Sequence, residues 1–281
     1  MTTGMAFALA AMLCFGLADL VYKRASATGV PAHHLMLVQA WCFGPSITLY
    51  AWLTHTLAFG WSAVWGALAG LLAFVGFLNF ARSLGTGSIS VVVPIFRLNF
   101  ALTAVLAIAF LGESVTATKL AGLLAVLVAV WLLLGAPSKH RVTDRLAFTQ
   151  VLIAFVLVGA SNLFYKIGLR AGALPESLLV AQAAAFNACA LTFALVVDRG
   201  LSPLTYNWRT PALAAVVLVV AFVLLLHSLA VGEASVYVPV AQMGFVVTAA
   251  IGILVFGEAL TARKLAGLGV AVAALVLLAA S

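Results

Sequence analysis

Long apolar stretches follow one another along almost the whole chain, and short groups of polar or turn-forming residues separate them. Because a helix needs roughly 20 apolar residues to cross the hydrocarbon core of a bilayer, each stretch predicts one membrane-spanning α-helix. Turn residues mark boundaries, as in Gly29-Val30-Pro31, and Thr210-Pro211 is typical of a helix start. The predicted helices lie near residues 4–22, 34–54, 62–82, 88–111, 117–135, 146–166, 177–197, 209–230, 235–256 and 262–280.

The composition excludes a water-exposed globule of this size. Of the 281 residues, 65% are hydrophobic and 7% are charged, with a mean hydropathy of +1.24, whereas soluble domains carry about 25% charged residues. The net charge of +7 does not indicate nucleic-acid binding, since the basic residues stand singly or in pairs at the ends of apolar stretches. Residues so placed anchor helices at the membrane surface. The predicted fold class is therefore an all-α polytopic membrane protein with about ten transmembrane helices.

An internal repeat divides the chain. Residues 111–123 read LGESVTATKLAGL and residues 256–268 read FGEALTARKLAGL, so nine of thirteen positions agree at an offset of 145. Nearer the start the offset is 143, and the matching residues there include Gly16, Tyr22 and Lys23 with Gly159, Tyr165 and Lys166.

The repeat predicts a first five-helix half at 1–137, a polar linker at 138–145 and a second five-helix half at 146–281. An odd number of spans per half makes the second half enter the membrane in the opposite direction to the first. Inverted repeats of this kind are characteristic of secondary transporters, whose substrate site lies near the midplane where the halves meet.

Several motifs are shared with one superfamily of transporters. Gly-Glu, a threonine and Leu-Ala-Gly-Leu occur in each half, the first and sixth predicted helices end in Gly-x-x-x-x-x-Tyr-Lys, and the fourth and ninth contain a proline. In these features the chain resembles the drug/metabolite transporter superfamily, and within it the EamA-type permeases. It departs from them at Phe15 and its counterpart Val158, where a tryptophan is usual, so no binding role is carried over to that position.

The resemblance implies a permease that moves a small polar metabolite, such as an amino acid or related carboxylate, by alternating access, with export as the expected direction. A lipid-carrier flippase and a non-transporting membrane scaffold are the alternatives. The expected partners are the small-molecule substrate and the lipid bilayer, in the cell (inner) membrane, and either a monomer or a homodimer fits.

No enzyme, cofactor, metal or nucleic-acid role is expected, since the sequence contains no HExxH, GxSxG or P-loop motif. The three cysteines, Cys14, Cys42 and Cys189, lie inside apolar stretches, which favours a packing role over disulfides or metal binding.

Arg97 lies well inside the fourth predicted helix, in VVVPIFRLNF. A charge at this depth costs at least a few kcal/mol, so Arg97 must face a cavity or a partner. We predict that it binds an anionic group of the substrate, such as a carboxylate; a structurally paired arginine is the alternative. Its repeat mate is Gln242, which is predicted to face the same cavity.

Pro94 and Pro239 are also repeat mates. Each lacks a backbone donor and leaves unpaired the carbonyl four residues earlier, at Ser90 or Ser235. A free carbonyl at membrane depth is tolerated beside a polar cavity or when buried in protein. These four residues therefore predict helix breaks that line the cavity, with plain packing kinks as the alternative.

Asp19 precedes Lys23 by four residues, the favourable order for an intrahelical ion pair, and a proton-coupling carboxylate is the alternative role. Its mate is Asn162, four residues before Lys166. His227, which could titrate near neutrality, completes the predicted substrate-binding set of Arg97, Gln242, Asp19, Lys23, Asn162, Lys166 and His227.

Glu113 and Glu258 each follow a glycine that closes one predicted helix and precede the next helix. A carboxylate in this place stabilises a helix N-terminus, so both are predicted to stabilise the helix that follows them in the chain.

The basic residues give a testable orientation. Alternate connectors carry unequal numbers of them, and positive charge is retained on the cytoplasmic side, which predicts that both termini lie outside, whereas the family resemblance implies cytoplasmic termini. The richer side carries Lys23, Arg24, Arg82, Lys139, Arg141, Arg145, Arg199, Arg209, Arg263 and Lys264, and the poorer side carries Lys119, Lys166 and Arg170.

A C-terminal fusion to a phosphatase that is active only outside the cytoplasm measures this orientation. Phosphatase activity is expected from the charge distribution. A silent phosphatase together with a fluorescent C-terminal fusion would show that the family resemblance, and not the charge distribution, gives the orientation.

Overall fold

The computed structural model describes residues 2–26, 32–58, 60–86, 89–134, 145–197, 208–254 and 261–281. The regular secondary structure of these residues is helical, as predicted. In chain order the helices are α1 (Thr3–Ser26), α2 (Ala32–Leu53), η1 (Trp61–Ala63), α3 (Val64–Thr86), α4 (Ile89–Arg97), α5 (Asn99–Leu111), α6 (Ala117–Leu134), α7 (Arg145–Arg170), α8 (Pro175–Val197), α9 (Arg209–Val231), α10 (Ala234–Gln242), α11 (Gly244–Leu254) and α12 (Ala262–Ala279).

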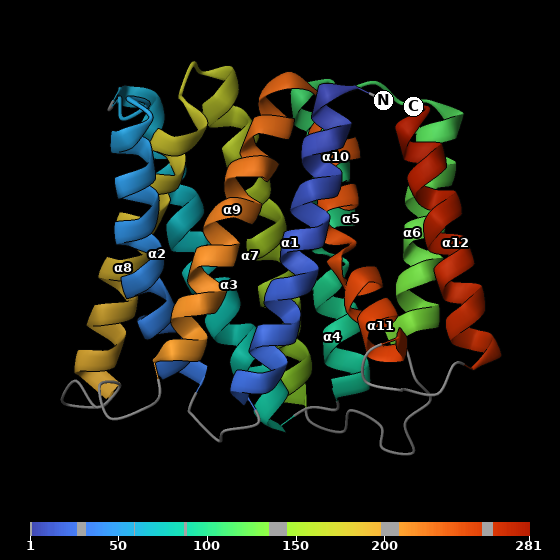
Figure 1. Cartoon of the computed structure of the whole chain (residues 1–281), viewed down its shortest axis with the longest axis horizontal. Coiled ribbons are helices and arrows are strands. Elements are labelled where there is room, and N and C mark those ends of the chain that lie inside the picture. The colour runs from blue at the N-terminus through green and yellow to red at the C-terminus, as the bar shows by residue number, and fades with distance from the viewer. Residues whose placement is uncertain are drawn as a thin grey trace.

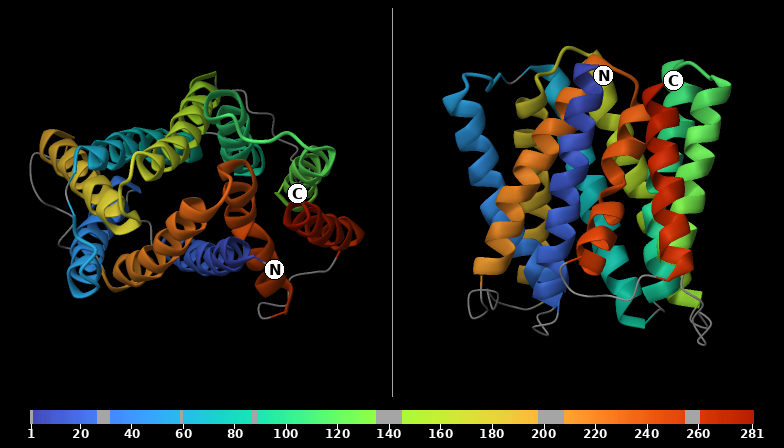
Figure 2. Two further views of the ribbon diagram at one scale, coloured as in Figure 1. Left: turned by 90° about the horizontal axis from the view of Figure 1, so that it is seen from above. Right: turned by 45° about the vertical axis from the view of Figure 1, so that its right-hand side comes forward.

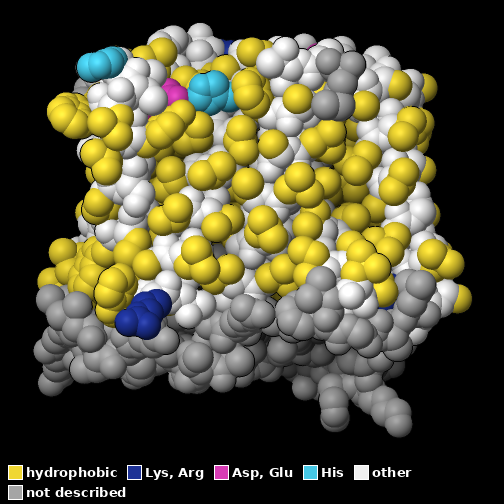
Figure 3. All heavy atoms as spheres, in the orientation of Figure 1, with side chains coloured by type: hydrophobic (Ala, Val, Ile, Leu, Met, Phe, Trp, Pro, Cys, Tyr) yellow, Lys and Arg dark blue, Asp and Glu magenta, His cyan; other side chains and the backbone are white. Residues whose placement is uncertain are grey.

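The described helices form a bundle of membrane-spanning length (Figure 1). Within the described ranges, nine segments are long and apolar enough to cross a membrane, and α4 with α5 and α10 with α11 each contribute one of them. Helix α2 is not among the nine, but it has 22 residues and runs alongside α8 and α9. Apolar side chains are spread over the flank seen in Figure 3, and the few charged side chains in view lie near its two edges, as expected for a polytopic membrane protein.

The two halves run in opposite directions. Figure 1 places both chain ends on one face of the bundle, which we name the termini face. Helix α1 starts at this face, whereas its counterpart α7 starts at Arg145 on the opposite face. The inverted arrangement expected from the repeat is confirmed, because five passes separate the start of α1 from the start of α7.

The halves are also interlocked, since the first helix of each half packs into the other half (Figure 2). Helix α1 packs on α9, α10 and α11, and α7 packs on the repeat mates α3, α4 and α5. The hydroxyl of Thr103 on α5 donates a hydrogen bond to the Gly159 carbonyl on α7 (3.0 Å), and its mate Thr248 on α11 donates one to the Gly16 carbonyl on α1 (3.1 Å). The same threonine-to-glycine hydrogen bond thus occurs twice, once from the first half to the second and once from the second half to the first.

The predicted fourth and ninth helices are each divided in two. The breaks lie at Leu98 and Met243, four residues after Pro94 and Pro239. The Leu98 amide donates to both the Pro94 and Ile95 carbonyls (3.2 and 3.1 Å), and the Met243 amide donates to Val240 (3.1 Å). Both breaks therefore tighten to hydrogen bonds over three residues. The sequence predicted a proline effect in each of these helices, and the structure places each break four residues after the proline.

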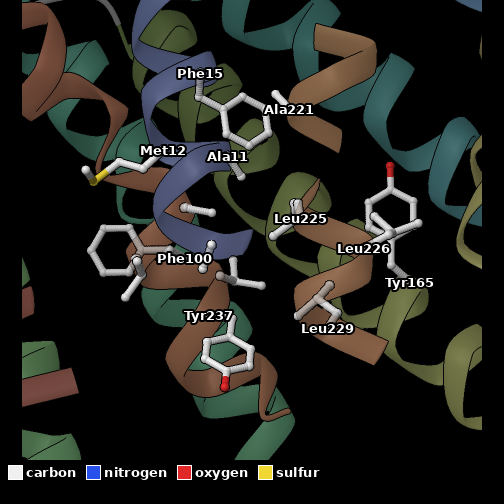
Figure 4. Packing of buried hydrophobic residues seen from close by; sticks show 14 of the residues in the cluster. Ala11, Met12, Phe15, Phe100, Tyr165, Ala221, Leu225, Leu226, Leu229 and Tyr237 are labelled. Atoms are coloured by element: carbon white, nitrogen blue, oxygen red, sulfur yellow. The ribbon is translucent and has the colours of Figure 1, made fainter. Parts of the chain in front are cut away.

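The core combines apolar side chains from both halves. Phe15 of α1 lies beside Ala221 of α9 (Figure 4), and its ring meets that of Phe222 edge to face with centroids 5.3 Å apart. Close helix approach occurs at glycines: Gly66 and Gly70 of α3 lie against the α8 backbone, where a Cβ would collide with carbonyl groups. Small residues allow such contact between membrane helices.

Gly16 should not tolerate a larger residue. A Cβ there would lie 2.7 Å from the Gly244 carbonyl oxygen and 2.6 Å from Val247, so Gly16→Ala is expected to destabilise the fold by about 1–3 kcal/mol, measured as thermal unfolding in detergent. Gly269→Ala is the matched control, because a Cβ on Gly269 meets nothing within 4 Å. Equal melting temperatures for the two variants would contradict the interlocked arrangement.

Candidate functional site

Arg97 is the last residue of α4 and forms an ion pair with Asp19 of α1. Its Nη2 atom lies 2.5 Å from Asp19 Oδ2, and the two side chains are 18% and 27% exposed. The pair supplies the partner that a charge at this depth requires. Both side chains keep some exposed surface.

The structure gives Asp19 a partner that the sequence analysis did not pair it with. The four-residue spacing indicated Lys23, but the carboxylate bonds Arg97, which is 78 positions away. Spacing within a helix reveals only neighbours on that helix, whereas this contact depends on how α1 and α4 lie relative to each other. The Lys23 side chain is outside the described part of the structure.

The repeat mates of this pair are Asn162 on α7 and Gln242, the last residue of α10. Asn162 is 3% exposed, and its Nδ2 has no hydrogen-bond partner. An unsatisfied buried donor costs about 1–3 kcal/mol. A charged pair in the first half therefore corresponds to neutral amides in the second.

Both pairs lie beside the helix breaks. Gly16 contacts Gly244, just after the break that follows Gln242, and Gly159 contacts the Asn99 carbonyl, just after the break that follows Arg97. Asp19 and Asn162 each lie three residues beyond the glycine on their own helix. Discontinuous helices that meet between inverted repeats form the substrate sites of transporters.

Two predicted site residues lie elsewhere, toward the termini face. Buried Lys166 donates from Nζ to the carbonyls of Leu229 (2.5 Å) and Gly232, at the C-terminal end of α9. His227 lies near the same end of α9, with Nε2 3.5 Å from Oε1 of buried Glu176 and Nδ1 2.9 Å from the Val223 carbonyl. The structure therefore does not bring Lys166 and His227 together with Arg97. Lys166 instead caps the C-terminal end of α9.

The proline-associated residues have separate surroundings. Pro94 lies half-buried in α4, and Pro239 is buried in α10. Ser235 is fully buried, and its hydroxyl has no hydrogen-bond partner. The Ser90 backbone belongs to α4, but its side chain is outside the described residues.

Glu113 caps a helix, although not the predicted one. Its carboxylate accepts hydrogen bonds from the amides of Ala234 and Ser235, both at 2.8 Å, at the start of α10 in the other half. Gly112, with φ of 64°, ends α5 in the left-handed conformation that glycine adopts readily. The sequence indicated α6 because it is next in the chain. Glu258 lies outside the described residues.

The sequence analysis did not predict the cluster of Lys119, Ser114 and Glu233 at the termini face. Lys119 is completely buried, and its Nζ donates to the Ser114 carbonyl (2.6 Å), the Ser114 hydroxyl (3.2 Å) and the Glu233 carboxylate. Burial raises the pKa of Glu233, but hydrogen bonds from Lys119 and Ser114, with the Lys119 charge, outweigh it and hold the pKa below its ordinary value. Lysine at both 119 and 264 of the repeat was the signal that could have identified this residue.

Removing the Glu113 carboxylate should weaken the start of α10. Glu113→Ala leaves two helix amides without an acceptor, and loss of a helix cap costs about 0.5–2 kcal/mol. The measurement is thermal unfolding in detergent. Val115→Ala is the control, since Val115 lies on the same connection and is 57% exposed. A melting temperature for Glu113→Ala equal to that of the control would contradict the capping role.

Comparisons with known proteins agree with this architecture. Residues 2–135 match the model of the family described as EamA-like transporter family. A solved crystal structure resembles the chain with a TM-score of 0.77 at 18% sequence identity, over 98% of this chain and 95% of the other. A search of the curated proteins found no match. At this identity the structural likeness shows the shared fold alone, and it extends over both halves.

Proposed function

Since the chain belongs, through residues 2–135, to the EamA-like transporter family of the drug/metabolite transporter superfamily, we propose that it exports a small zwitterionic metabolite, such as an amino acid, by alternating access. Its membrane is proposed to be the cell's inner membrane.

The ion pair between Asp19 and Arg97 is the observation that carries the substrate class. A zwitterion presents the same two charges, so its carboxylate can bind the guanidinium while its ammonium group binds the aspartate. Arginine suits this role because its planar guanidinium matches a carboxylate. Each charge then exchanges one partner for another, which avoids the high cost of an unpaired charge in a low-dielectric site.

Asn162 and Gln242 support the same proposal from the second half. Their amide groups can hydrogen-bond a polar substrate without adding net charge. The unpartnered Nδ2 of Asn162 supplies a donor for the substrate once the halves reorient. Asn162 is buried, whereas Gln242, like Asp19 and Arg97, is only partly buried, so three of the four side chains keep some exposed surface.

Transport by the purified protein in liposomes, with a panel of labelled amino acids, tests the proposal. Arg97→Ala is expected to lower transport by roughly 100-fold or more, as for loss of a charged contact worth about 3 kcal/mol. Arg97→Lys should retain part of the activity if charge alone suffices and little if the guanidinium geometry matters. Asp19→Asn should lower the transport of amino acids more than that of simple carboxylates. Only an amino acid carries an ammonium group, and this group would lose the aspartate as its partner.

Arg263→Ala is the matched control, since Arg263 lies away from the breaks, with Nη2 bonded to the Trp131 carbonyl (2.5 Å). It should transport like the unaltered protein. If Arg97→Ala transports as well as Arg263→Ala, Arg97 does not bind the substrate.

A further inference from the structure

The polar contacts at the termini face join the two halves of the chain. Glu113 of the first half holds the first two residues of α10 in the second half, and Lys119 of the first half pairs with Glu233 of the second. Arg170 of α7 adds a third link, donating from Nη1 to the Leu111 carbonyl at the end of α5 (2.6 Å). All three links must break if the halves are to separate on this face.

Burial makes the central link sensitive to separation. Lys119 is 0% exposed, whereas the Glu233 side chain is 36% exposed. A buried ammonium group is stable only with its partners, since removing them leaves an uncompensated charge away from water. Separation of the halves without entry of water at Lys119 is therefore unfavourable. The Glu233 carboxylate is ionised at neutral pH, since its pKa is held below its ordinary value in spite of burial, and its charge favours contact with Lys119.

Helix α10 connects these links to the candidate site. It begins at Ala234, directly after Glu233, and ends at Gln242 beside the break. Figure 1 shows it running inward from the termini face. The hydroxyl of Tyr237, one turn into α10, also lies 3.2 Å from the hydroxyl of Thr2, which directly precedes α1. Movement of the α10 N-terminus therefore changes the position of Gln242 at the other end of the same nine-residue helix.

We propose that Lys119, Glu233 and Ser114, together with the Glu113 cap, form the gate that closes the termini face during transport. In this structure the gate is closed. Its opening separates Glu233 from Lys119, admits water to the lysine and frees α10 to move away from the connection between α5 and α6. The proposal rests on the alternating-access part of the proposed function and is independent of the substrate.

Cysteine accessibility tests the gate without measuring transport. Cys14, Cys42 and Cys189 are first replaced by alanine, and Ser235→Cys then provides a thiol that is fully buried just behind the gate. The labelling rate with a membrane-impermeant maleimide, applied to the termini face of oriented vesicles, reports opening. Lys119→Met and Glu233→Gln are each expected to raise this rate by roughly tenfold or more, because each removes one charge of the ion pair that holds the buried Lys119.

Three controls make the result specific. Trp61→Cys, 87% exposed in η1 between α2 and α3, should label at one rate in every background. Arg263→Ala removes a link between the same helix α6 and the second half at the opposite face and should leave Ser235→Cys protected. Glu233→Asp keeps the charge and should raise labelling less than Glu233→Gln.

Size-exclusion profiles identify variants that fail to fold. If Lys119→Met does not fold, Glu233→Gln tests the gate by itself. This variant is expected to fold because the Glu233 side chain is partly exposed. Unchanged labelling of Ser235→Cys in folded Glu233→Gln would overturn the gate. If Arg97→Ala transports normally while Glu233→Gln accelerates labelling, the substrate proposal fails and the gate stands.

Discussion

A polar group inside the hydrocarbon core of a bilayer must find its partner within the protein, because no water is available there. Much of this bundle follows from that requirement. The hydroxyls of Thr103 and Thr248 bond to glycine carbonyls of the opposite half, and the ammonium group of Lys166 bonds to the carbonyls that end α9. Several of the bonds that satisfy polar groups therefore also hold the halves together, so packing and polar pairing cannot be altered separately.

Symmetric and asymmetric positions of the repeat have different roles. The glycines at 16 and 159 and the threonines at 103 and 248 make the same contacts in both halves and form the common scaffold. Asp19 with Arg97, by contrast, is matched by the neutral residues Asn162 and Gln242. In the proposed transport cycle, a scaffold that is shared by both halves would allow either face to close, and the unequal pairs would give the substrate one charged and one neutral side to contact.

The position of α10 relates the site to the termini face. Glu113 and Lys119 act on its first turn, while Gln242 ends it beside the contact of Gly16 with Gly244. Helix α10 has nine residues between a polar cap and a break, so hydrogen bonds at both of its ends can be exchanged when it moves. If the proposed gate and site are correct, closure of the termini face and access to the site depend on the same helix, α10.

The sequence by itself determined the helical membrane fold, the two inverted halves and the depth of Arg97 in its helix, because span length, repeat matching and the rarity of buried charge are all readable along one chain. It also located the prolines that precede both breaks. Only the tertiary structure decided that Asp19 pairs with Arg97, that Glu113 caps α10 and that Lys166 caps α9. These partners lie far apart in sequence, and spacing within a helix carries no information about which helix of the other half lies opposite. The sequence pattern reveals which groups need partners, whereas the packing of interlocked halves decides which partners they find.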